Sequence, residues 1–303
     1  MSNKVIFILG PTAAGKTKIA VKLAYKFNGE IISVDSRQVY KGMDIGTGKD
    51  LDEYKYQGAR YKVQIPYHLI DVASPKSQFT AGKYQRMANK AIRDVINRGK
   101  MPVICGGSPF YIYSVVDGLV LPPKTSESSR KKLNKLTLKQ LLVKLKKLDA
   151  KAYNQIDKKN RRRVQRAVEV CLETGKKFSF FGEKKKQDYD FLLLGINWPK
   201  EELKKRITER LKERIEKEGM IQEVKRLHKR GVSWKRLDDF GLEYRWVSRY
   251  LQRKISYDEM FEKLNNDINN FSKRQMTWFK RDKRIRWVKD LKRAERLVKK
   301  FIV

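Results

Sequence analysis

The chain has 303 residues and carries 71 lysines and arginines against 34 aspartates and glutamates, a net charge of +37. This length is sufficient for a buried core, and it suggests about two domains. No run approaches the roughly 18 apolar residues of a membrane span, and the N-terminal apolar run is too short for a signal peptide, so we expect neither. Cys105 and Cys171 lack zinc-binding spacing, and their apolar surroundings predict buried free thiols in a reducing cytoplasm.

The positive charge is unevenly distributed. Residues 1–122 carry 18 basic and 9 acidic side chains, whereas residues 123–303 carry 53 and 25. A basic surface of this size attracts polyanions by releasing their counterions, which favours nucleic acid as a partner. The alternative is a lysine-rich chain with solvated helix faces, and the charge alone does not decide between the two.

The first expected element is a buried strand over Val5–Leu9, followed by a loop that fits G-x-x-x-x-G-K-[ST] and a helix over Lys18–Phe27. In this context backbone N–H groups converge on an anion at the helix N-terminus, and Lys16 adds a charge. The Thr17 hydroxyl is placed to ligate Mg²⁺. The alternative is a chance glycine-rich loop. The residues expected to hold a polyphosphate are Gly10, Pro11, Thr12, Ala13, Ala14, Gly15, Lys16 and Thr17.

A second expected strand, Glu30–Val34, leads into the polar string Asp35-Ser36-Arg37-Gln38-Val39-Tyr40. Strand ends lie at the active edge of a parallel sheet, so we expect Asp35 to face the phosphate loop. There it would act as a magnesium partner, a substrate ligand or a general base. The structural alternative is an Asx-turn or a helix cap.

Beyond a polar loop over residues 40–61, strands and helices continue to alternate. The patterns predict a short strand over His68–Val72, a helix over Ala81–Arg98 that ends at Gly99, and a strand over Met101–Cys105. This alternation predicts a parallel sheet with helices on both faces.

The pattern changes near Pro122-Pro123, after which only helical periods occur until a charged linker over Glu183–Asp188. We therefore expect an α/β fold in which residues 1–122 form the first part of a P-loop core, residues 123–188 a helical insertion module, and residues 189–303 the rest of the core with C-terminal helices. The elements expected in this part are helices over Lys131–Leu148 and Arg161–Glu173 (closed by Gly175), a strand over Phe191–Ile196, helices over Lys200–Lys217, Ile221–Arg230 and Asp258–Lys280, and a strand over Ile285–Val288.

Two strings are much more specific than the phosphate loop: Asp35–Tyr40, and Lys273-Arg274-Gln275-Met276-Thr277-Trp278. Less specific strings accompany them at Gly10–Thr17, Ser33–Thr47, His68–Asp71, Gly106–Ser108, Arg163 with Arg166–Val170, and Thr174-Gly175. Together they resemble the tRNA dimethylallyltransferase family (the IPP transferase family), in family order and over nearly the whole chain.

The resemblance implies a P-loop NTPase-like parallel sheet with an inserted all-helical tRNA-binding module. It implies transfer of a dimethylallyl group from its diphosphate to N6 of adenosine 37 in tRNAs that read codons beginning with U. The P-loop would then hold diphosphate rather than ATP, with Mg²⁺ on Thr17, and Asp35 would accept the N6 proton. Arg206 and Arg210 match family arginines, one of which clamps diphosphate, although their spacing alone also fits a charged helix face. The residues expected to act in catalysis are Asp35, Ser108, Arg206 and Arg210.

The target base must leave the anticodon-loop stack to reach such a pocket. Ser108 stands where the family usually has Thr, so a hydroxyl remains for the flipped base. Trp278 taken alone is more typical of a core residue than of a stacking platform. The residues that the resemblance assigns to tRNA are Asp35, Ser36, Arg37, Gln38, Ser108, Arg130, Arg162, Arg163, Val164, Gln165, Arg166, Lys273, Arg274, Gln275 and Trp278.

The chain also departs from the family pattern. Asn160 stands where the family commonly has Asp, Tyr67 where it has His, and Pro109 removes a backbone donor after Gly107. His68 and His228 are isolated in the sequence, and we interpret both as structural.

Three alternatives remain open on the sequence. They are a P-loop kinase of a small metabolite or nucleoside, an enzyme that prenylates free adenine nucleotides, and a non-catalytic RNA-binding protein. The expected partners are the tRNA anticodon stem-loop and dimethylallyl diphosphate, with no membrane, and we expect a cytoplasmic monomer.

Overall fold

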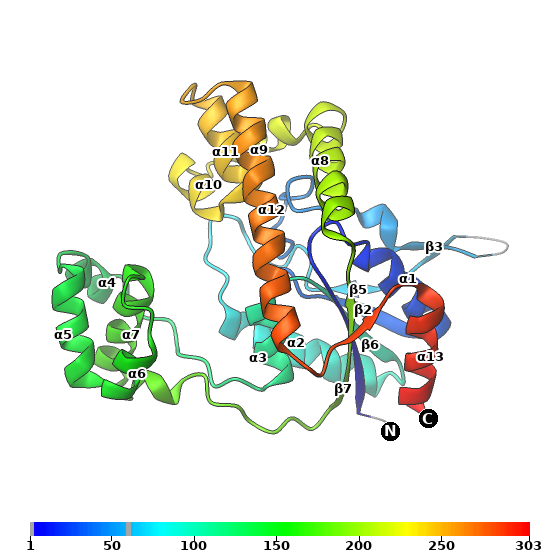
Figure 1. Ribbon diagram of the computed structural model, residues 1–303, viewed down its shortest axis with the longest axis horizontal. Coiled ribbons are helices and arrows are strands. Elements are labelled where there is room, and N and C mark those ends of the chain that lie inside the picture. Colours follow the sequence, from blue (N-terminus) through cyan, green and yellow to red (C-terminus); the bar gives the residue numbers. More distant parts are fainter. Residues whose placement is uncertain (1–2, 59–61) are drawn as a thin grey trace. The chain divides into compact units, whose positions relative to one another are not determined.

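The computed structural model describes residues 3–58 and 62–303 and divides the chain into two units (Figure 1). The first unit comprises Met1–Ile112 and Asp188–Val303, and the second comprises Tyr113–Gln187. The first boundary falls inside helix α3 (Pro109–Val116), ten residues before the boundary expected at Pro122-Pro123. The difference arises because α3 begins in the first unit and continues into the second without a break.

The first unit is built on a six-stranded parallel sheet with the strand order β5-β2-β6-β1-β7-β8. Residues Val5–Leu9 of β1 are fully buried, as expected for a strand covered on both faces. Because β1 lies between β6 and β7, the loop that follows β1 emerges at the centre of the C-terminal edge of the sheet. The predicted parallel α/β architecture is confirmed. The strands are β1 (Lys4–Leu9), β2 (Gly29–Ser33), β5 (Tyr67–His68), β6 (Met101–Gly106), β7 (Asp190–Ile196) and β8 (Arg286–Val288).

Helices cover both faces of this sheet. Helix α1 (Lys16–Lys26) and helix α13 (Leu291–Ile302) share one apolar cluster with the strands, and α2 (Ala81–Asn97) packs on β2 and β6. The chain moves outward from β1 to β2 and back to β6, so right-handed crossovers place α1 and α2 on opposite faces.

Five helices lie in the chain between β7 and β8 (Figure 1, yellow-green to orange). Helix α12 packs against α8 and α11 and begins at a capping box formed by Ser256 and Glu259. Helices α10 and α11 were not predicted; both are short, and Gly241, with a φ of +71°, separates them. The five are α8 (Lys200–Glu216), α9 (Met220–Lys229), α10 (Trp234–Phe240), α11 (Leu242–Leu251) and α12 (Tyr257–Arg281).

Two local expectations in the first unit are wrong. The strand expected over His68–Val72 ends at His68, because Leu69 and Asp71 have φ values of +63° and +55° that no strand allows. The expected loop over residues 40–61 contains structure, and its residues 59–61 lie outside the described residues. That structure is the 3₁₀ helix η1 (Leu51–Tyr54) and strand β3 (Lys55–Gln57), which pairs antiparallel with β4 (Lys62–Gln64).

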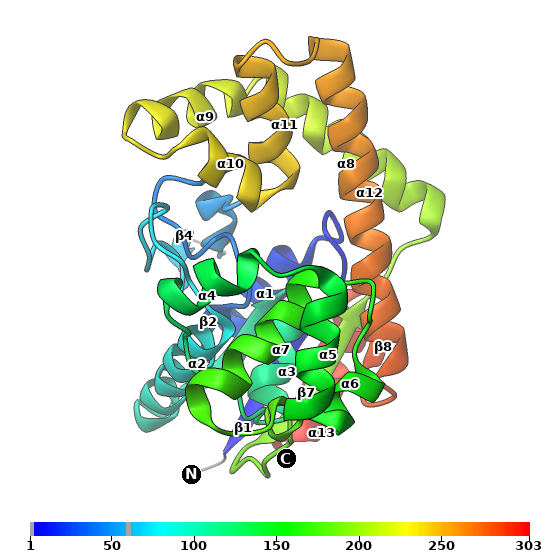
Figure 2. The same cartoon turned by 90° about the vertical axis from the view of Figure 1, so that its left-hand side faces the viewer.

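The second unit is helical, as predicted, with its own apolar core (Figure 2, green). The single helix expected over Lys131–Leu148 is two helices, because Thr137 and Gln140 form a capping box that starts a new one. Its last long helix ends at Gly175 in the left-handed conformation, as predicted. The elements are α4 (Glu127–Asn134), α5 (Leu138–Leu148), α6 (Ala150–Gln155), α7 (Arg161–Thr174) and the 3₁₀ helix η2 (Phe178–Phe180).

Both cysteines, Cys105 and Cys171, are free and buried, as predicted. None of the described helices combines the length and apolarity needed to cross a membrane.

Candidate active site

The phosphate loop after β1 is shaped by its backbone. Gly10 has a φ of +154° and packs so closely on the backbone of Ile196 that a Cβ would lie 2.6 Å from its carbonyl oxygen. Gly15 precedes α1 with a φ of +76°, and no side chain caps the first turn of that helix. The first-turn N–H groups of α1 are therefore left for an anionic ligand. Lys16 Nζ folds back over the loop and donates to Pro11 O at 2.7 Å.

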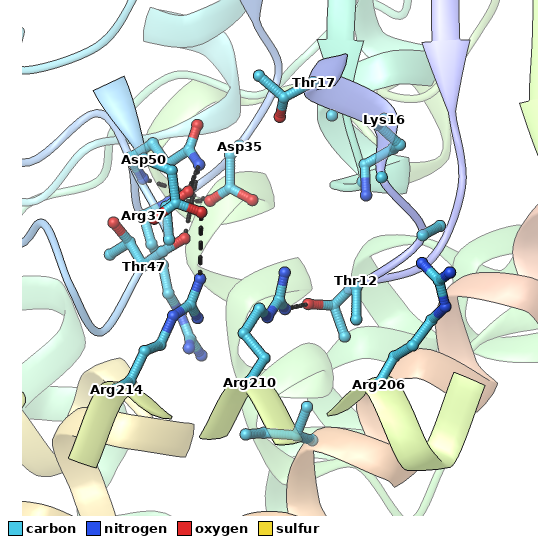
Figure 3. A pocket seen from close by; sticks show the side chains of 18 of the residues that line it. Thr12, Lys16, Thr17, Asp35, Arg37, Thr47, Asp50, Arg206, Arg210 and Arg214 are labelled. Carbon is cyan, nitrogen blue, oxygen red and sulfur yellow. Dashed lines mark hydrogen bonds and ion pairs between the residues drawn. The ribbon is translucent and has the colours of Figure 1, made fainter. Parts of the chain in front are cut away.

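The loop opens into a cavity of about 700 Å³ at the C-terminal edge of the sheet (Figure 3). Its walls include the phosphate loop, the segments Asp35–Gln38 and Gly46–Gly48, η1, the end of β6 through Ser108, and helices α8, α11 and α12, all of the first unit. The fold therefore brings Thr12–Thr17 of the phosphate loop, the segment Asp35–Gln38 and Ser108 to one cavity, whereas Gly10 and Pro11 lie outside its lining.

Asp35 lies on the cavity wall facing the phosphate loop (Figure 3). Its Oδ1 accepts hydrogen bonds from the backbone N–H groups of Arg37 (2.8 Å) and Gln38 (3.3 Å). Within the described residues, Oδ2 has no hydrogen-bond partner. The Asx-turn and the functional interpretation therefore both apply, because one oxygen fixes the side chain and the other remains available to accept a proton.

Ser108 joins two of the cavity loops. Its Oγ accepts a hydrogen bond from Ser36 N at 3.0 Å, and its side chain is buried. The hydroxyl proton remains available to a ligand in the cavity, since the Oγ serves here as acceptor. Arg37 donates to Glu243 at 3.2 Å, and Gln38 donates to Gly48 O at 2.9 Å, so these two predicted tRNA contacts hold the Asp35 loop in place.

Helix α8 presents three arginines to the cavity, Arg206, Arg210 and Arg214 (Figure 3). Their spacing of four residues places them on one face of the helix. Arg206 stacks over Trp198, with its Cζ 3.7 Å from the ring centroid, and donates to Glu202 at 2.9 Å. Arg210 donates to the Thr12 hydroxyl of the phosphate loop. Arg206 and Arg210 were predicted from the sequence and Arg214 was not, although the same four-residue spacing could have revealed it.

Gln275 was predicted to contact tRNA, which stays a prediction, but in the free protein its side chain has partners within the chain. Its side chain is 3% exposed, accepts a hydrogen bond from Thr12 N at 2.9 Å and donates to Gly107 O at 2.6 Å. Both ends of the amide are thus occupied by the protein's own backbone. Its neighbours on α12, Lys273, Arg274 and Trp278, are exposed, so the interpretation of Trp278 as a core residue is wrong.

The remaining predicted tRNA residues belong to the second unit. Arg162 and Arg163 are exposed on α7. Val164 is fully buried in the core of this unit, and Gln165 is buried with its amide donated to Asn134, so neither side chain is available to RNA. These two side chains are buried because α7 turns that face toward its neighbouring helices, and their assignment to tRNA stays a prediction.

Arg130 and Arg166 of the second unit surround the buried carboxylate of Glu169. Arg130 Nε lies 3.3 Å from Glu169 Oε1, and Arg166 Nη1 lies 3.6 Å from Oε2. Arg166 also donates to Pro123 O at 2.6 Å. Both arginines therefore have a structural role in the free protein, and both remain partly exposed.

The cations around the cavity repel one another and are poorly solvated. Burial lowers the pKa of Lys16 to about 8, and the charge of Arg210 acts in the same direction. Burial and the charge of Arg214 lower the pKa of Arg210 to about 10. An anion bound among these groups would relieve both costs, so the electrostatics favour an anionic ligand.

The oxygen donors near Thr17 are compatible with Mg²⁺. The Thr17 hydroxyl lines the cavity together with Glu53, whose pKa is raised by burial and by the nearby Asp50. Mg²⁺ usually takes one or two protein oxygens and completes its shell with phosphate and water. Among the described residues no group of three His, Cys, Asp or Glu side chains could hold a metal ion.

This architecture occurs in a known protein family. The IPP transferase family model matches residues 38–282. Curated relatives include tRNA dimethylallyltransferase 2 of Citrifermentans bemidjiense, 44% identical over 91% of this chain and 86% of its own, and tRNA dimethylallyltransferase 1 of Syntrophus aciditrophicus, 42% identical over 94% and 92%.

Two solved structures share this fold. The tRNA isopentenylpyrophosphate transferase of Bacillus halodurans superposes with a TM-score of 0.69 at 31% identity, covering 99% of this chain and 96% of that one. A eukaryotic dimethylallyltransferase solved acting on tRNA has a TM-score of 0.75 at 24% identity, covering 96% and 75%, which shows a shared fold. The matched residues, the identities and the shared fold together establish that this chain belongs to the IPP transferase family, the tRNA dimethylallyltransferases.

Proposed function

We propose that the chain transfers the dimethylallyl group of dimethylallyl diphosphate to N6 of adenosine 37 in tRNAs that read codons beginning with U. The observation that supports this most directly is that one cavity holds both a cationic phosphate loop and a carboxylate oxygen, Asp35 Oδ2, that has no hydrogen-bond partner among the described residues. Family membership supports the same reaction.

The bond changes follow from the chemistry of the two substrates. The lone pair of N6 attacks C1 of the dimethylallyl group, the C1–O bond breaks, and its electron pair leaves with diphosphate. The N6 proton passes to Asp35 Oδ2, while Oδ1 stays bound to the backbone of Arg37 and Gln38. The N–H groups at the start of α1, together with Lys16 and Arg206, stabilise the charge that develops on the leaving group.

Mg²⁺ fits at Thr17, where it would neutralise charge on the leaving diphosphate. Within the protein, the residues that would hold the ion are Thr17, through its hydroxyl oxygen, and Glu53, whose carboxylate lines the same part of the cavity.

The tRNA is proposed to use exposed basic and aromatic groups of each unit: Lys273, Arg274 and Trp278 in the first, and Arg162 and Arg163 in the second. Guanidinium planes and the indole ring suit unpaired loop bases, and the cations suit the backbone. A cytoplasmic reaction follows from the substrate, and we propose a monomer because one chain supplies every residue of the cavity.

Purified protein incubated with dimethylallyl diphosphate, Mg²⁺ and unmodified tRNA tests this function. We expect one diphosphate released for each dimethylallyl group found on the RNA by mass spectrometry, and no product with a tRNA carrying guanosine at position 37. Transfer of phosphate from labelled ATP to a small acceptor would instead indicate a kinase, and faster prenylation of AMP than of tRNA would indicate the free-nucleotide enzyme.

The lowered pKa of Lys16 predicts the pH dependence of donor use. The ammonium is charged below pH 8 and loses its proton as the pH rises through about 8. The kcat/KM for dimethylallyl diphosphate is therefore expected to be level near pH 7 and to fall by up to about tenfold per unit at higher pH, because kcat/KM reports the free enzyme. In Lys16→Arg the guanidinium stays charged, so this fall should disappear even if activity is lower. An unchanged alkaline limb in that variant contradicts the assignment.

Binding of tRNA is expected to weaken steeply with salt. If about four phosphates are neutralised, affinity falls roughly 10²-fold between 50 and 200 mM salt. Equilibrium binding to unmodified tRNA measures this, with the double variant Lys273→Met and Arg274→Met expected to give a shallower slope. A salt-independent affinity would show that the net charge of +37 lies outside the interface.

A further inference from the structure

Arg214 is a buried cation that makes no hydrogen bond through two of its nitrogens. The residue is 5% exposed, and neither Nε nor Nη2 has a hydrogen-bond partner within the described residues. The nearest carboxylate oxygen, Asp50 Oδ2, lies 3.7 Å from Nη2, an ion-pair distance that is too long for a hydrogen bond. The other two arginines on this face of α8 are both hydrogen-bonded within the protein.

This arrangement is unfavourable for the protein alone. A buried donor without an acceptor loses the hydration that it had in the unfolded chain, and a buried charge requires close pairing. The charge of Arg214 also depresses the pKa of its neighbour Arg210. A ligand that supplies acceptor oxygens would remove these costs.

The position is nevertheless closely fitted to this side chain. Gly48 has a φ of +65°, and a Cβ there would overlap the Arg214 guanidinium. The carbonyl of Gly48 is held by Gln38 at 2.9 Å, so the loop against which the guanidinium packs is itself anchored. A glycine with this backbone conformation thus leaves the space that the buried guanidinium occupies.

The chemistry of the ligand follows from which buried nitrogens lack a hydrogen-bond partner among the described residues. Nε and Nη2 form one edge of the guanidinium, the fork that pairs with two oxygens of a single phosphate or carboxylate. The cavity side on which Arg214 lies is that of Thr47, Asp50 and Asp35, whereas Arg206 lies beside the phosphate loop (Figure 3). Arg214 therefore lies at the acceptor end of the cavity, where Gly48 and Asp50 cover its Nε–Nη2 edge and Asp50 has to move before a ligand can reach it.

We propose that Arg214 binds a phosphate of the RNA backbone next to the flipped adenosine through its Nε–Nη2 fork, and so seats the acceptor nucleotide against Asp35. This inference rests on the proposed function and adds a substrate-binding residue to it. In the free protein the Asp50 carboxylate lies next to Arg214, at the position proposed for the phosphate. Its exposed side chain moves aside when RNA binds.

Three variants test the proposal: Arg214→Met, Arg214→Lys and Asp50→Asn. Arg214→Met is expected to weaken tRNA binding about tenfold in the absence of donor and to reduce the slope of log K against log salt by about 0.7–0.9. Arg214→Lys, which keeps the charge without the fork, should recover the slope and only part of the affinity. Asp50→Asn should leave tRNA affinity unchanged or increase it.

Thermal unfolding separates binding from a structural role. Removing an unsatisfied buried charge should leave the melting temperature of Arg214→Met unchanged or raise it. A lower melting temperature shared by Arg214→Met and Asp50→Asn, with non-additive effects in the double variant and unchanged tRNA affinity, would show a structural ion pair and overturn the proposal.

The source of the phosphate is decided by inhibition with inorganic diphosphate. Its inhibition constant and the KM for dimethylallyl diphosphate should change little in Arg214→Met. A large rise in both, with tRNA affinity intact, would assign Arg214 to the donor and overturn the RNA assignment. Prenyl transfer by the unaltered protein is measured in parallel, so loss of this inference alone leaves the proposed function standing.

Discussion

Replacing Asp35 by Asn is expected to lower kcat for prenyl transfer by about 10²–10⁴ while the affinity for tRNA changes little. The amide keeps the shape of the side chain and an oxygen that can accept from Arg37 N and Gln38 N, so the loop stays folded. What it loses is the oxygen that takes the N6 proton as the new C–N bond forms. Single-turnover transfer with saturating substrates measures the effect, and equilibrium binding measures the affinity.

Asp52→Asn provides a matched control, because its carboxylate is largely exposed and, among the described residues, forms an ion pair with Lys55. It should retain full activity. If Asp35→Asn turns over at the rate of this control, the proton leaves by another route and Asp35 only shapes the loop.

The central part of the fold could be predicted from the sequence because its signals are local. An apolar run that leads directly into a glycine-rich phosphate loop fixes β1, and the run over Phe191–Ile196 fixes β7 next to it. The specific strings around Asp35 and Lys273 then placed the chain in its family. Such features need no knowledge of distant contacts.

The features that the sequence did not reveal have a common cause, because each depends on contacts between residues that are far apart in the chain. Val164 and Gln165 lie in a string that matched the family, yet which face of α7 is buried depends on how α4 and α5 pack on it. The strand expected over His68–Val72 was stopped by two residues with positive φ, and composition gives no warning of that for Leu69. The role proposed for Arg214 can be inferred only from the folded cavity, in which α8 lies next to Gly48 and Asp50.

Gln275 shows this dependence on distant contacts most clearly. Its place in the Lys-Arg-Gln string suggested an RNA contact, but its amide bridges Thr12 in the phosphate loop and Gly107 in the loop that carries Ser108. Ser108 in turn holds Ser36 beside Asp35. One side chain of α12 thus fixes the donor loop relative to the acceptor loops, which makes Gln275 a positioning residue.

Gln275→Met is therefore expected to lower kcat/KM for both substrates by about 10²-fold, because displacing aligned groups by about 1 Å has this effect and two buried backbone groups lose their partners. Gln275→Glu keeps an acceptor for Thr12 N but sets a carboxylate oxygen against Gly107 O, so it should rescue little.

The role of Gln275 is identified by which quantities change in the variant: kcat, tRNA affinity or inhibition by diphosphate. Lys273→Met, two residues away and exposed on the same helix, should weaken tRNA binding alone. For Gln275→Met we expect kcat to fall with tRNA affinity nearly unchanged, and inhibition by diphosphate to weaken because Thr12 is no longer held. If the variant instead behaves as Lys273→Met does, Gln275 reaches RNA in the complex and the bridge seen here is broken when tRNA binds.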